Sequence, residues 1–191
     1  MNDLTFRTAT LDDIPALIEL VTSSYRGDAS RQGWTTEADL LDGQRIDADG
    51  LAHDIQRPDS LILLGCAGDG QDPAGAQQIL ACAHLAIEDG AGYFGMFSVR
   101  PGQQGNGIGK QMMIEAERIV ARQWQLPSVR MTVIDVRDEL IAFYQRRGYV
   151  RTGIKKPFPY GDERYGIPRR DDLRFEVLEK DLRHAFAEQP A

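Results

Sequence analysis

The sequence predicts a mixed α/β fold in which helices flank a central, mainly antiparallel sheet. Three short apolar runs in the middle of the chain are separated by turn residues, which is typical of a strand meander. A segment with helical apolar spacing follows them, and strand-like and helical segments alternate at both ends. With 191 residues, 42% of them hydrophobic and 27% charged, the chain has the size and composition of one globular domain over residues 1–191.

The N-terminal elements follow from alternation and capping. Residues 4–9 alternate as a half-buried strand does, and Asp12 and Asp13 can begin a helix. The apolar face of that helix consists of Ile14, Leu17, Ile18 and Val21. Thr35 or Thr36 can cap a second helix that runs to Leu41, and residues 48–56 can form another turn or two.

The three apolar runs predict the second, third and fourth strands, at residues 61–67, 79–87 and 93–99. An amphipathic helix of about four turns is expected after a glycine-rich run at 104–109. Residues 129–134 predict the fifth strand, and Asp138 can cap the helix that follows it. Residues 173–179 predict a last strand, and the Pro-, Gly- and Tyr-rich stretch at 155–172 predicts a functional loop.

Charge and targeting signals exclude several classes of function. A formal net charge of -7 would repel nucleic acid and anionic membranes, so an anionic ligand has to be captured locally. We expect no membrane span and a cytoplasmic location, because neither a leader nor a run of about 20 apolar residues is present. Cys66 and Cys82 lie in apolar runs without metal-ligand spacing, which favours buried free thiols and no metal site.

The glycine run, Gln104-Gly105-Asn106-Gly107-Ile108-Gly109, lies between a predicted strand and a predicted helix. Glycines there leave several backbone N–H groups accessible, and the helix dipole adds a favourable field for an anion such as a pyrophosphate. Glycines in this position can also serve only as turn residues. A P-loop would need Ser or Thr after Lys110, where Gln111 stands, and a dinucleotide fold would place the run after a first parallel strand.

The run and its context resemble the GNAT superfamily of acetyl-CoA-dependent N-acetyltransferases. The family motif Gln/Arg-x-x-Gly-x-Gly/Ala is matched at Gln104, Gly107 and Gly109. A second match, Ile141 to Tyr149, is similar to the family's Phe-Tyr-x-x-x-Gly-Phe helix end. The resemblance implies a sheet opened by a V-shaped split between the fourth and fifth strands, acetyl-CoA as co-substrate and an amine as acceptor.

The resemblance also assigns cofactor-binding residues. Backbone groups beside the bulge of the fourth strand would bind pantetheine at Phe97 and Val99. The pyrophosphate would be held by Gln104, Gly105, Asn106, Gly107, Ile108, Gly109 and Lys110. Arg137 stands where the family often carries Asn, which puts one pantetheine contact in question, and Asp138 can take over the helix cap.

Catalytic candidates follow from the same comparison. Tyr144 would lie near the thioester sulfur, where a phenol with a pKa of about 10 can protonate the leaving thiolate. The base that accepts the amine proton is open among Glu88, Tyr93, His84 and water. Attack is expected to be direct, because neither cysteine lies in a matched catalytic motif.

Acceptor specificity is expected from the irregular segments 33–37 and 157–165. Aromatic rings with interspersed acids, represented by Trp34, Tyr160 and Asp162, could hold the stem and cationic head of an amine. The identity of the acceptor is not encoded in any motif, and a homodimer is left open. One alternative is a non-catalytic acyl-CoA sensor on the same fold. The other is an ATP-dependent kinase, which is less favoured because this chain lacks the Ser or Thr that a P-loop needs.

Overall fold

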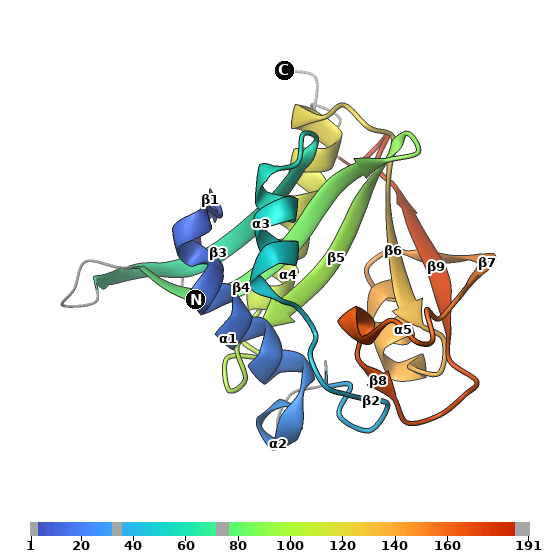
Figure 1. Ribbon diagram of the computed structural model, residues 1–191. Helices are drawn as coiled ribbons and strands as arrows, with labels where there is room; N and C mark the ends of the chain where they lie inside the picture. The colour runs from blue at the N-terminus through green and yellow to red at the C-terminus, as the bar shows by residue number, and fades with distance from the viewer. Residues whose placement is uncertain (1–3, 32–35, 72–76, 186–191) are drawn as a thin grey trace.

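The fold is a seven-stranded sheet flanked by helices, as the computed structural model shows for residues 4–31, 36–71 and 77–185 (Figure 1). The strand order is β1-β3-β4-β5-β6-β9-β7, and a separate pair is formed by β2 and β8. The strands of the large sheet are β1 Leu4–Thr8, β3 Ser60–Gln71, β4 Gln77–Glu88, β5 Ala91–Val99, β6 Ser128–Ile134, β7 Val150–Pro157 and β9 Arg174–Asp181. The small pair consists of β2 Leu41–Asp42 and β8 Ile167–Pro168. The predicted mixed fold with a mainly antiparallel sheet is confirmed.

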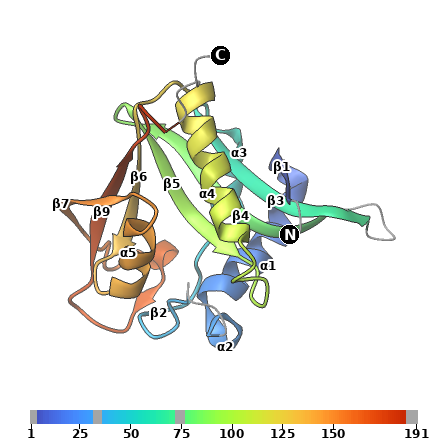
Figure 2. The same cartoon turned by 180° about the vertical axis from the view of Figure 1, so that it is seen from behind.

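The predicted split lies between β5 and β6. These two strands are parallel and pair only at Gly92 with Val129 and at Tyr93 with Arg130. All other neighbouring strands in the sheet are antiparallel. Figures 1 and 2 show that β5 and β6 diverge from this junction, so the sheet consists of two half-sheets joined at one end.

Helices cover both faces of the sheet. The main helices are α1 Ile14–Tyr25, α2 Gly27–Ser30, α3 Ala48–Gln56, α4 Ile108–Arg118 and α5 Asp138–Gln145. α1 and α3 lie on one face, and α4 and α5 lie on the other (Figures 1 and 2). Each face has its own apolar core, one centred on Leu17, Leu20 and Ile62, the other on Met112, Val120 and Ile141. No helix in the described part of the chain has the length and apolar character needed to cross a membrane.

The chain enters α1 through a capped 3₁₀ turn at Leu11–Asp13. The backbone N–H of Thr10 donates to the Asp13 carboxylate at 2.8 Å, and the same carboxylate accepts two 2.7 Å hydrogen bonds from Arg7 on β1. The arginine hydrogen bonds hold the pKa of Asp13 below its usual value. This contact fixes the first strand to the first helix, as the paired acids at 12 and 13 indicated.

Two local predictions are wrong. Residues 36–41 do not form a helix: Leu40 and Leu41 both donate to the carbonyl of Glu37 in one turn, and Leu41 then pairs with Pro168 in β2. Tertiary pairing overrides the local preference here. Asp138 is not the cap of α5 but its first residue, because Arg137 occupies the N-cap position without a side-chain hydrogen bond. The predicted buried free thiols at Cys66 and Cys82 are confirmed.

Candidate active site

A cavity of about 690 Å³ lies between the glycine run and helix α5. We call it the loop cavity. Its lining consists of Val99, Gln104, Gly105, Gly107, Gly109, Lys110, Glu139, Ala142, Phe143, Arg146 and Arg147. Five of the predicted cofactor-binding positions between 104 and 110 therefore line one cavity with helix α5, which begins about 30 residues further along the chain.

The glycine run forms the start of α4. Gly107 is the N-cap residue and has a φ of +82°, in the left-handed region that favours glycine. A Cβ atom at Gly105 or Gly107 would meet no atom within 4 Å, so both backbones border open space. Gln104 donates from its side-chain amide to the carbonyl of Val99 at 3.3 Å, which ties the loop to the end of β5. The first N–H groups of α4 are available to an anion, and the cavity gives an anion room to reach them.

Three cations surround the loop cavity: Lys110 from α4, and Arg146 and Arg147 from the C-terminal end of α5. The guanidinium of Arg147 stacks over the ring of Phe143, 3.4 Å from its centroid, and donates to the Phe143 carbonyl at 2.8 Å. Neither arginine was predicted from the sequence to bind a ligand. Their position just before the second motif's glycine was the available signal, since a helix end beside a phosphate loop can supply cations.

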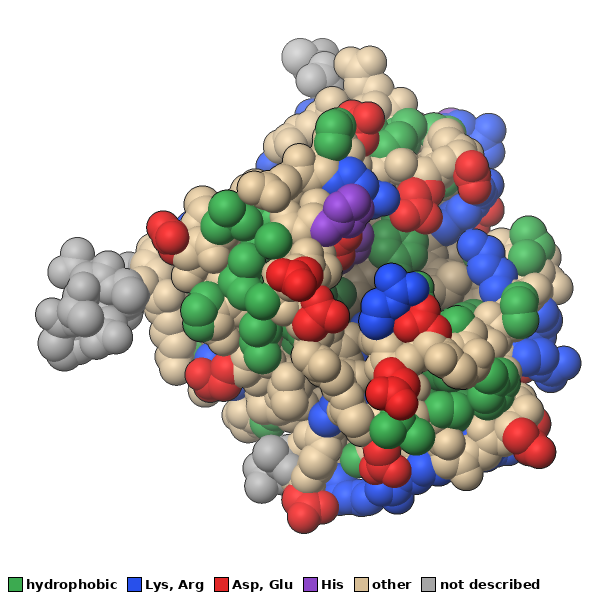
Figure 3. Space-filling view, in the orientation of Figure 1, with side chains coloured by type: hydrophobic (Ala, Val, Ile, Leu, Met, Phe, Trp, Pro, Cys, Tyr) green, Lys and Arg blue, Asp and Glu red, His purple; other side chains and the backbone are tan. Residues whose placement is uncertain are grey.

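A second cavity of about 460 Å³ occupies the split between β5 and β6. We call it the split cavity. Its lining consists of Tyr25, Glu37, Arg45, Glu88, Tyr93, Phe94, Gly95, Met96, Phe97, Met131, Thr132, Val133, Ile134, Arg137, Leu140, Tyr144, Lys156, Pro157, Pro159, Tyr165 and Phe175. Figure 3 shows the hollow in this face of the molecule, with basic and acidic side chains at its rim and hydrophobic side chains deeper inside. The cavity is thus a mainly aromatic and aliphatic space with a few charged groups.

Tyr144 lies on α5 with its side chain buried and lines the split cavity. Its ring makes edge contacts with Phe143, which lines the loop cavity, and with Tyr149. Burial raises the pKa of Tyr144 well above its ordinary value, so the phenol carries its proton at neutral pH. A buried proton donor therefore lies on the helix that borders both cavities.

The three residues considered as bases lie at different depths. Glu88 and Tyr93 line the split cavity, and burial raises the pKa of Tyr93. His84 does not line it: its Nε2 is 2.9 Å from the Ser60 hydroxyl, its Nδ1 is 3.7 Å from Asp54, and its ring contacts Tyr93 edge-on. Burial lowers the pKa of His84, which favours the neutral ring. His84 can therefore act on the cavity only through Tyr93 or water.

The predicted bulge of the fourth strand is present in β5. Met96 and Phe97 together stand opposite the single residue Ala83, and Met96 has a φ of +48°. The carbonyl of Phe97 accepts a 2.6 Å hydrogen bond from the Tyr25 hydroxyl. The carbonyl of Val99 accepts from Gln104, as described above, and from Ser24 at 3.3 Å. Phe97 lines the split cavity and Val99 the loop cavity, so the bulge lies where the two cavities approach each other.

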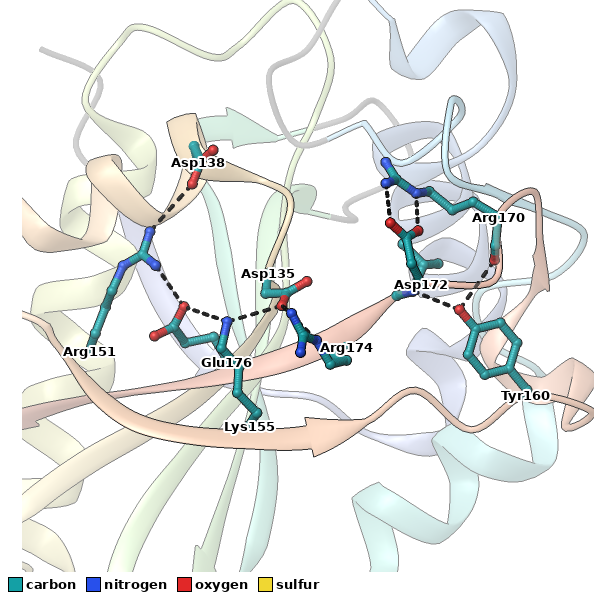
Figure 4. Close-up of polar contacts among 10 residues, drawn as sticks. Asp135, Asp138, Arg151, Lys155, Tyr160, Arg170, Asp172, Arg174 and Glu176 are labelled. Atoms are coloured by element: carbon teal, nitrogen blue, oxygen red, sulfur yellow. Dashed lines mark hydrogen bonds and ion pairs between the residues drawn. The ribbon is translucent and has the colours of Figure 1, made fainter.

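The predicted acceptor residues are not gathered at the split cavity. The Tyr160 hydroxyl accepts from the N–H of Leu173 at 2.7 Å and donates to the carbonyl of Arg170 at 3.2 Å, which fastens the long loop to the start of β9 (Figure 4). Asp162 is paired with Arg164 at 2.6 Å. Their neighbours Pro159 and Tyr165 line the cavity instead. Trp34 lies outside the described residues.

An ion-pair network holds together the strands that carry this loop. Glu176 on β9 accepts from Arg151 at 2.8 Å and from Lys155 at 3.3 Å, both on β7 (Figure 4). Lys155 also reaches Asp135 at 3.0 Å, just after β6. The loop from β7 to β9 therefore begins and ends on a cross-linked half-sheet, which fixes the positions of its cavity-lining residues.

Arg137, which stands where the family that the sequence resembles often carries Asn, belongs to a charged cluster that was not predicted from the sequence. Its Nη1 lies 3.4 Å from Glu37, and Glu37 also receives a 2.7 Å contact from Arg26 and a 3.9 Å contact from Arg45. The four residues are separated by up to 111 positions, and no spacing rule brings them together. Among the described residues, no group of three or more His, Cys, Asp or Glu side chains is placed to hold a metal ion.

Comparison with known proteins finds a similar domain family. Residues 69–151 match the model of the acetyltransferase (GNAT) domain, and this stretch contains both motifs. No curated protein sequence matches the chain.

Solved structures extend the likeness over almost the whole fold. The ribosomal-protein-S18-alanine N-acetyltransferase from Escherichia coli aligns over 99% of this chain and 100% of its own, with a TM-score of 0.66 and 12% identity. An N-acetyltransferase from Staphylococcus aureus Mu50 aligns over 94% of this chain and 98% of its own, with a TM-score of 0.65 and 14% identity. The spermidine/spermine N-acetyltransferase from Vibrio cholerae aligns over 94% and 95%, with a TM-score of 0.60 and 14% identity. A family model thus matches the segment that carries both motifs, and these N-acetyltransferases share the fold of the chain, so residues 69–151 are similar to the acetyltransferase (GNAT) domain.

Proposed function

We propose that this acetyltransferase binds acetyl-CoA with its phosphates in the loop cavity and transfers the acetyl group directly to an amine in the split cavity. One observation carries the proposal: each of two elements, β5 and α5, has one residue that lines the loop cavity and a nearby residue that lines the split cavity. On β5 these are Phe97 and Val99, and on α5 they are Phe143 and Tyr144. A donor and an acceptor held in these cavities would meet beside β5 and α5, as acyl transfer requires.

The residues of the loop cavity fit the phosphates of coenzyme A. Backbone N–H groups at the start of α4 supply donors, and Lys110, Arg146 and Arg147 supply positive charge. A hydrogen bond to a charged oxygen contributes about 1.5–3 kcal/mol, so a few of them outweigh the diffuse repulsion from a protein of net charge -7. The bulge at Met96 and Phe97 lies between this cavity and the split, which suits the pantetheine arm.

The thioester of the donor supplies an activated acyl group. The nitrogen of the acceptor forms a bond to the carbonyl carbon as the bond from that carbon to sulfur breaks. Tyr144 donates its phenolic proton to the departing thiolate, and its raised pKa means that the phenol is protonated throughout the neutral range before the thiolate forms. The acceptor nitrogen loses its proton to Glu88 or water, or to His84 through Tyr93 or water.

A covalent intermediate on cysteine has no support in the geometry. Cys66 and Cys82 are buried in β3 and β4 and line neither cavity. Burial raises the pKa of Cys82 to about 12, so its thiol stays protonated and is a poor nucleophile. Direct attack on the thioester is therefore the proposed route.

The structural relatives are named for different acceptors: an alanine of a ribosomal protein in one and a polyamine in another. No acceptor is carried over from them, since identity is below 15%. A cytoplasmic location, a single domain and a homodimer stay predictions from the sequence.

The test is a thermal-shift measurement followed by a mass-spectrometric screen. Acetyl-CoA and CoA should raise the Tm, and ATP and NAD should raise it much less, because a ligand that binds only the native state stabilises it. Incubation of acetyl-CoA with a broad panel of amines should then yield at least one acetylated product. Equal shifts from all four ligands would contradict the assignment of the loop cavity. A rise in Tm with CoA, without acetylation of any amine in the panel, would favour the non-catalytic acyl-CoA sensor.

A further inference from the structure

The ionisable groups of the split cavity carry more positive than negative charge. The lining contains Arg45, Arg137 and Lys156 against Glu37 and Glu88. Arg26, behind the lining, contacts Glu37 as well. Acids among the aromatic residues were expected to hold a cationic amine, but the charges that surround this cavity have the opposite balance.

Glu37 lies at the centre of three guanidinium groups. Its Oε2 is 2.7 Å from Arg26 Nη1 and 3.9 Å from Arg45 Nε, and its Oε1 is 3.4 Å from Arg137 Nη1. The side chains of Glu37 and Arg137 are 9% exposed and that of Arg26 is 6% exposed. One carboxylate therefore faces three cations in a place that is mostly shielded from water.

Excess charge in a shielded site is unfavourable unless a counter-ion compensates it. Two further acids, Asp42 and Glu88, contact arginines outside the cluster. Asp42 makes 2.5 and 2.8 Å hydrogen bonds to Arg169. Glu88 is 48% exposed and lies 4.0 Å from Arg57. The cluster therefore keeps a positive excess on the side that lines the cavity.

Arg45 is the member of the cluster that is placed to bind a ligand. Its guanidinium makes the 3.9 Å contact with Glu37 and lies over the Tyr25 ring, with its carbon 5.1 Å from the ring centroid. Within residues 4–31, 36–71 and 77–185 it donates no hydrogen bond, and its side chain is 27% exposed. A guanidinium that lies over a ring and has unused N–H donors suits a carboxylate, which accepts two parallel hydrogen bonds.

We propose that the acceptor is a small amine that itself carries a carboxylate, of the amino-acid type, and that Arg45 binds this carboxylate. Arg137 and Lys156 add to the favourable potential. The amine end lies toward Tyr144 and Tyr93, and the volume of about 460 Å³ suits a small molecule. This inference rests on the proposed function, because it names the acceptor class of the same cavity.

The test compares three forms of each acceptor: an amino acid, its carboxamide and the corresponding amine without the carboxyl group. Acetylation is followed by release of the CoA thiol at saturating acetyl-CoA, over a set of side chains. Wild type should use the best amino acid about 10- to 100-fold more efficiently, in kcat/KM, than its carboxamide or amine. Arg45→Gln should bring this ratio of kcat/KM values close to one, mainly by raising KM for the amino acid. Arg45→Lys should keep part of the preference for the amino acid.

Arg130→Gln is the matched control. Arg130 lies on β6, pairs with Glu179 at 3.2 Å and does not line the split cavity, so the preference should stay as in wild type. The Tm of each variant with and without CoA shows that it is folded. If wild type acetylates amines but uses the carboxamides or carboxyl-free amines as well as the acids, the acceptor class is wrong while the proposed function stands. If no amine is acetylated although CoA raises the Tm, the proposed function fails and the acceptor class with it.

Discussion

The loop cavity and the split cavity are built in different ways. The loop cavity is lined by the end of β5 at Val99, the segment 104–110 and the α5 region, and backbone N–H groups at the start of α4 border it together with three cationic side chains. The split cavity collects side chains from Tyr25 to Phe175, carried by helices, strands and loops on both half-sheets. A site made from backbone needs glycines at a fixed spacing and leaves a motif. A site made from dispersed side chains leaves none. The four predictions below test this contrast, from the largest expected effect to the smallest.

Replacing Tyr144 by Phe tests the point where the two cavities approach each other. The ring and its packing against Phe143 and Tyr149 are kept, but the proton for the leaving thiolate is lost. We expect kcat to fall by about 10² to 10⁴, with little change in Tm or in affinity for CoA. Tyr149→Phe is the matched control: its hydroxyl bonds to Glu117 at 3.1 Å and lines neither cavity. A folded Tyr144→Phe variant with wild-type turnover, while acetyl transfer limits the rate, would remove Tyr144 from the mechanism.

Replacing Gly107 by Asp tests the backbone-built site. The change places a carboxylate where phosphate oxygens are expected and should weaken CoA binding on the order of 100-fold, measured by calorimetry. Gly102→Asp separates this effect from backbone strain. Gly102 has the same φ of +82° but does not line the loop cavity. If both variants lose CoA equally, the loss comes from strain and the anion site is not supported.

The third prediction compares two tyrosines of the loop between β7 and β9. Tyr165 lines the split cavity, whereas the hydroxyl of Tyr160 holds the loop to residues 170 and 173. Tyr165→Ala should raise KM for the acceptor several-fold and leave the affinity for acetyl-CoA unchanged. Tyr160→Phe should lower the Tm instead. An acceptor KM that rises only with Tyr160→Phe would restore the prediction made from the sequence.

The smallest effect concerns stability against pH. Burial lowers the pKa of His84 below 6.5, and Arg57 adds to this, while Asp54 opposes it. The unfolded chain therefore takes up a proton more readily than the folded one, so His84 lowers stability as the pH falls through 6.5. Between pH 7.5 and 5.5, the free energy of unfolding should fall more in wild type than in His84→Gln, measured by urea denaturation. Equal losses would show that His84 is not protonated differently in the two states.

The same contrast explains what could be predicted from the sequence. Strand and helix positions followed from apolar spacing, and Gly107 marked the start of α4. Leu41 was predicted to lie in a helix but pairs with Pro168 in β2. Local spacing could not predict this pairing, because its partner is 127 residues away. The cluster of Glu37, Arg45 and Arg137 likewise exists only in three dimensions. Local rules therefore predicted the segment 104–110 that lines the loop cavity, and missed Arg146, Arg147 and most of the lining of the split cavity.

The two register pairs that join β5 to β6 also give the molecule a pivot. From Tyr93, β5 continues for six residues to Val99, which is about 20 Å at roughly 3.3 Å per residue. Over that lever arm, a rotation of about 5° moves the far end of the strand by about 2 Å. The pivot is tightly packed: a Cβ at Gly92 would lie 2.5 Å from the Val120 side chain. Because β5 and β6 pair only at this junction, the packing of Val120 against Gly92 bears on how far apart the two strands lie at the other end of the split.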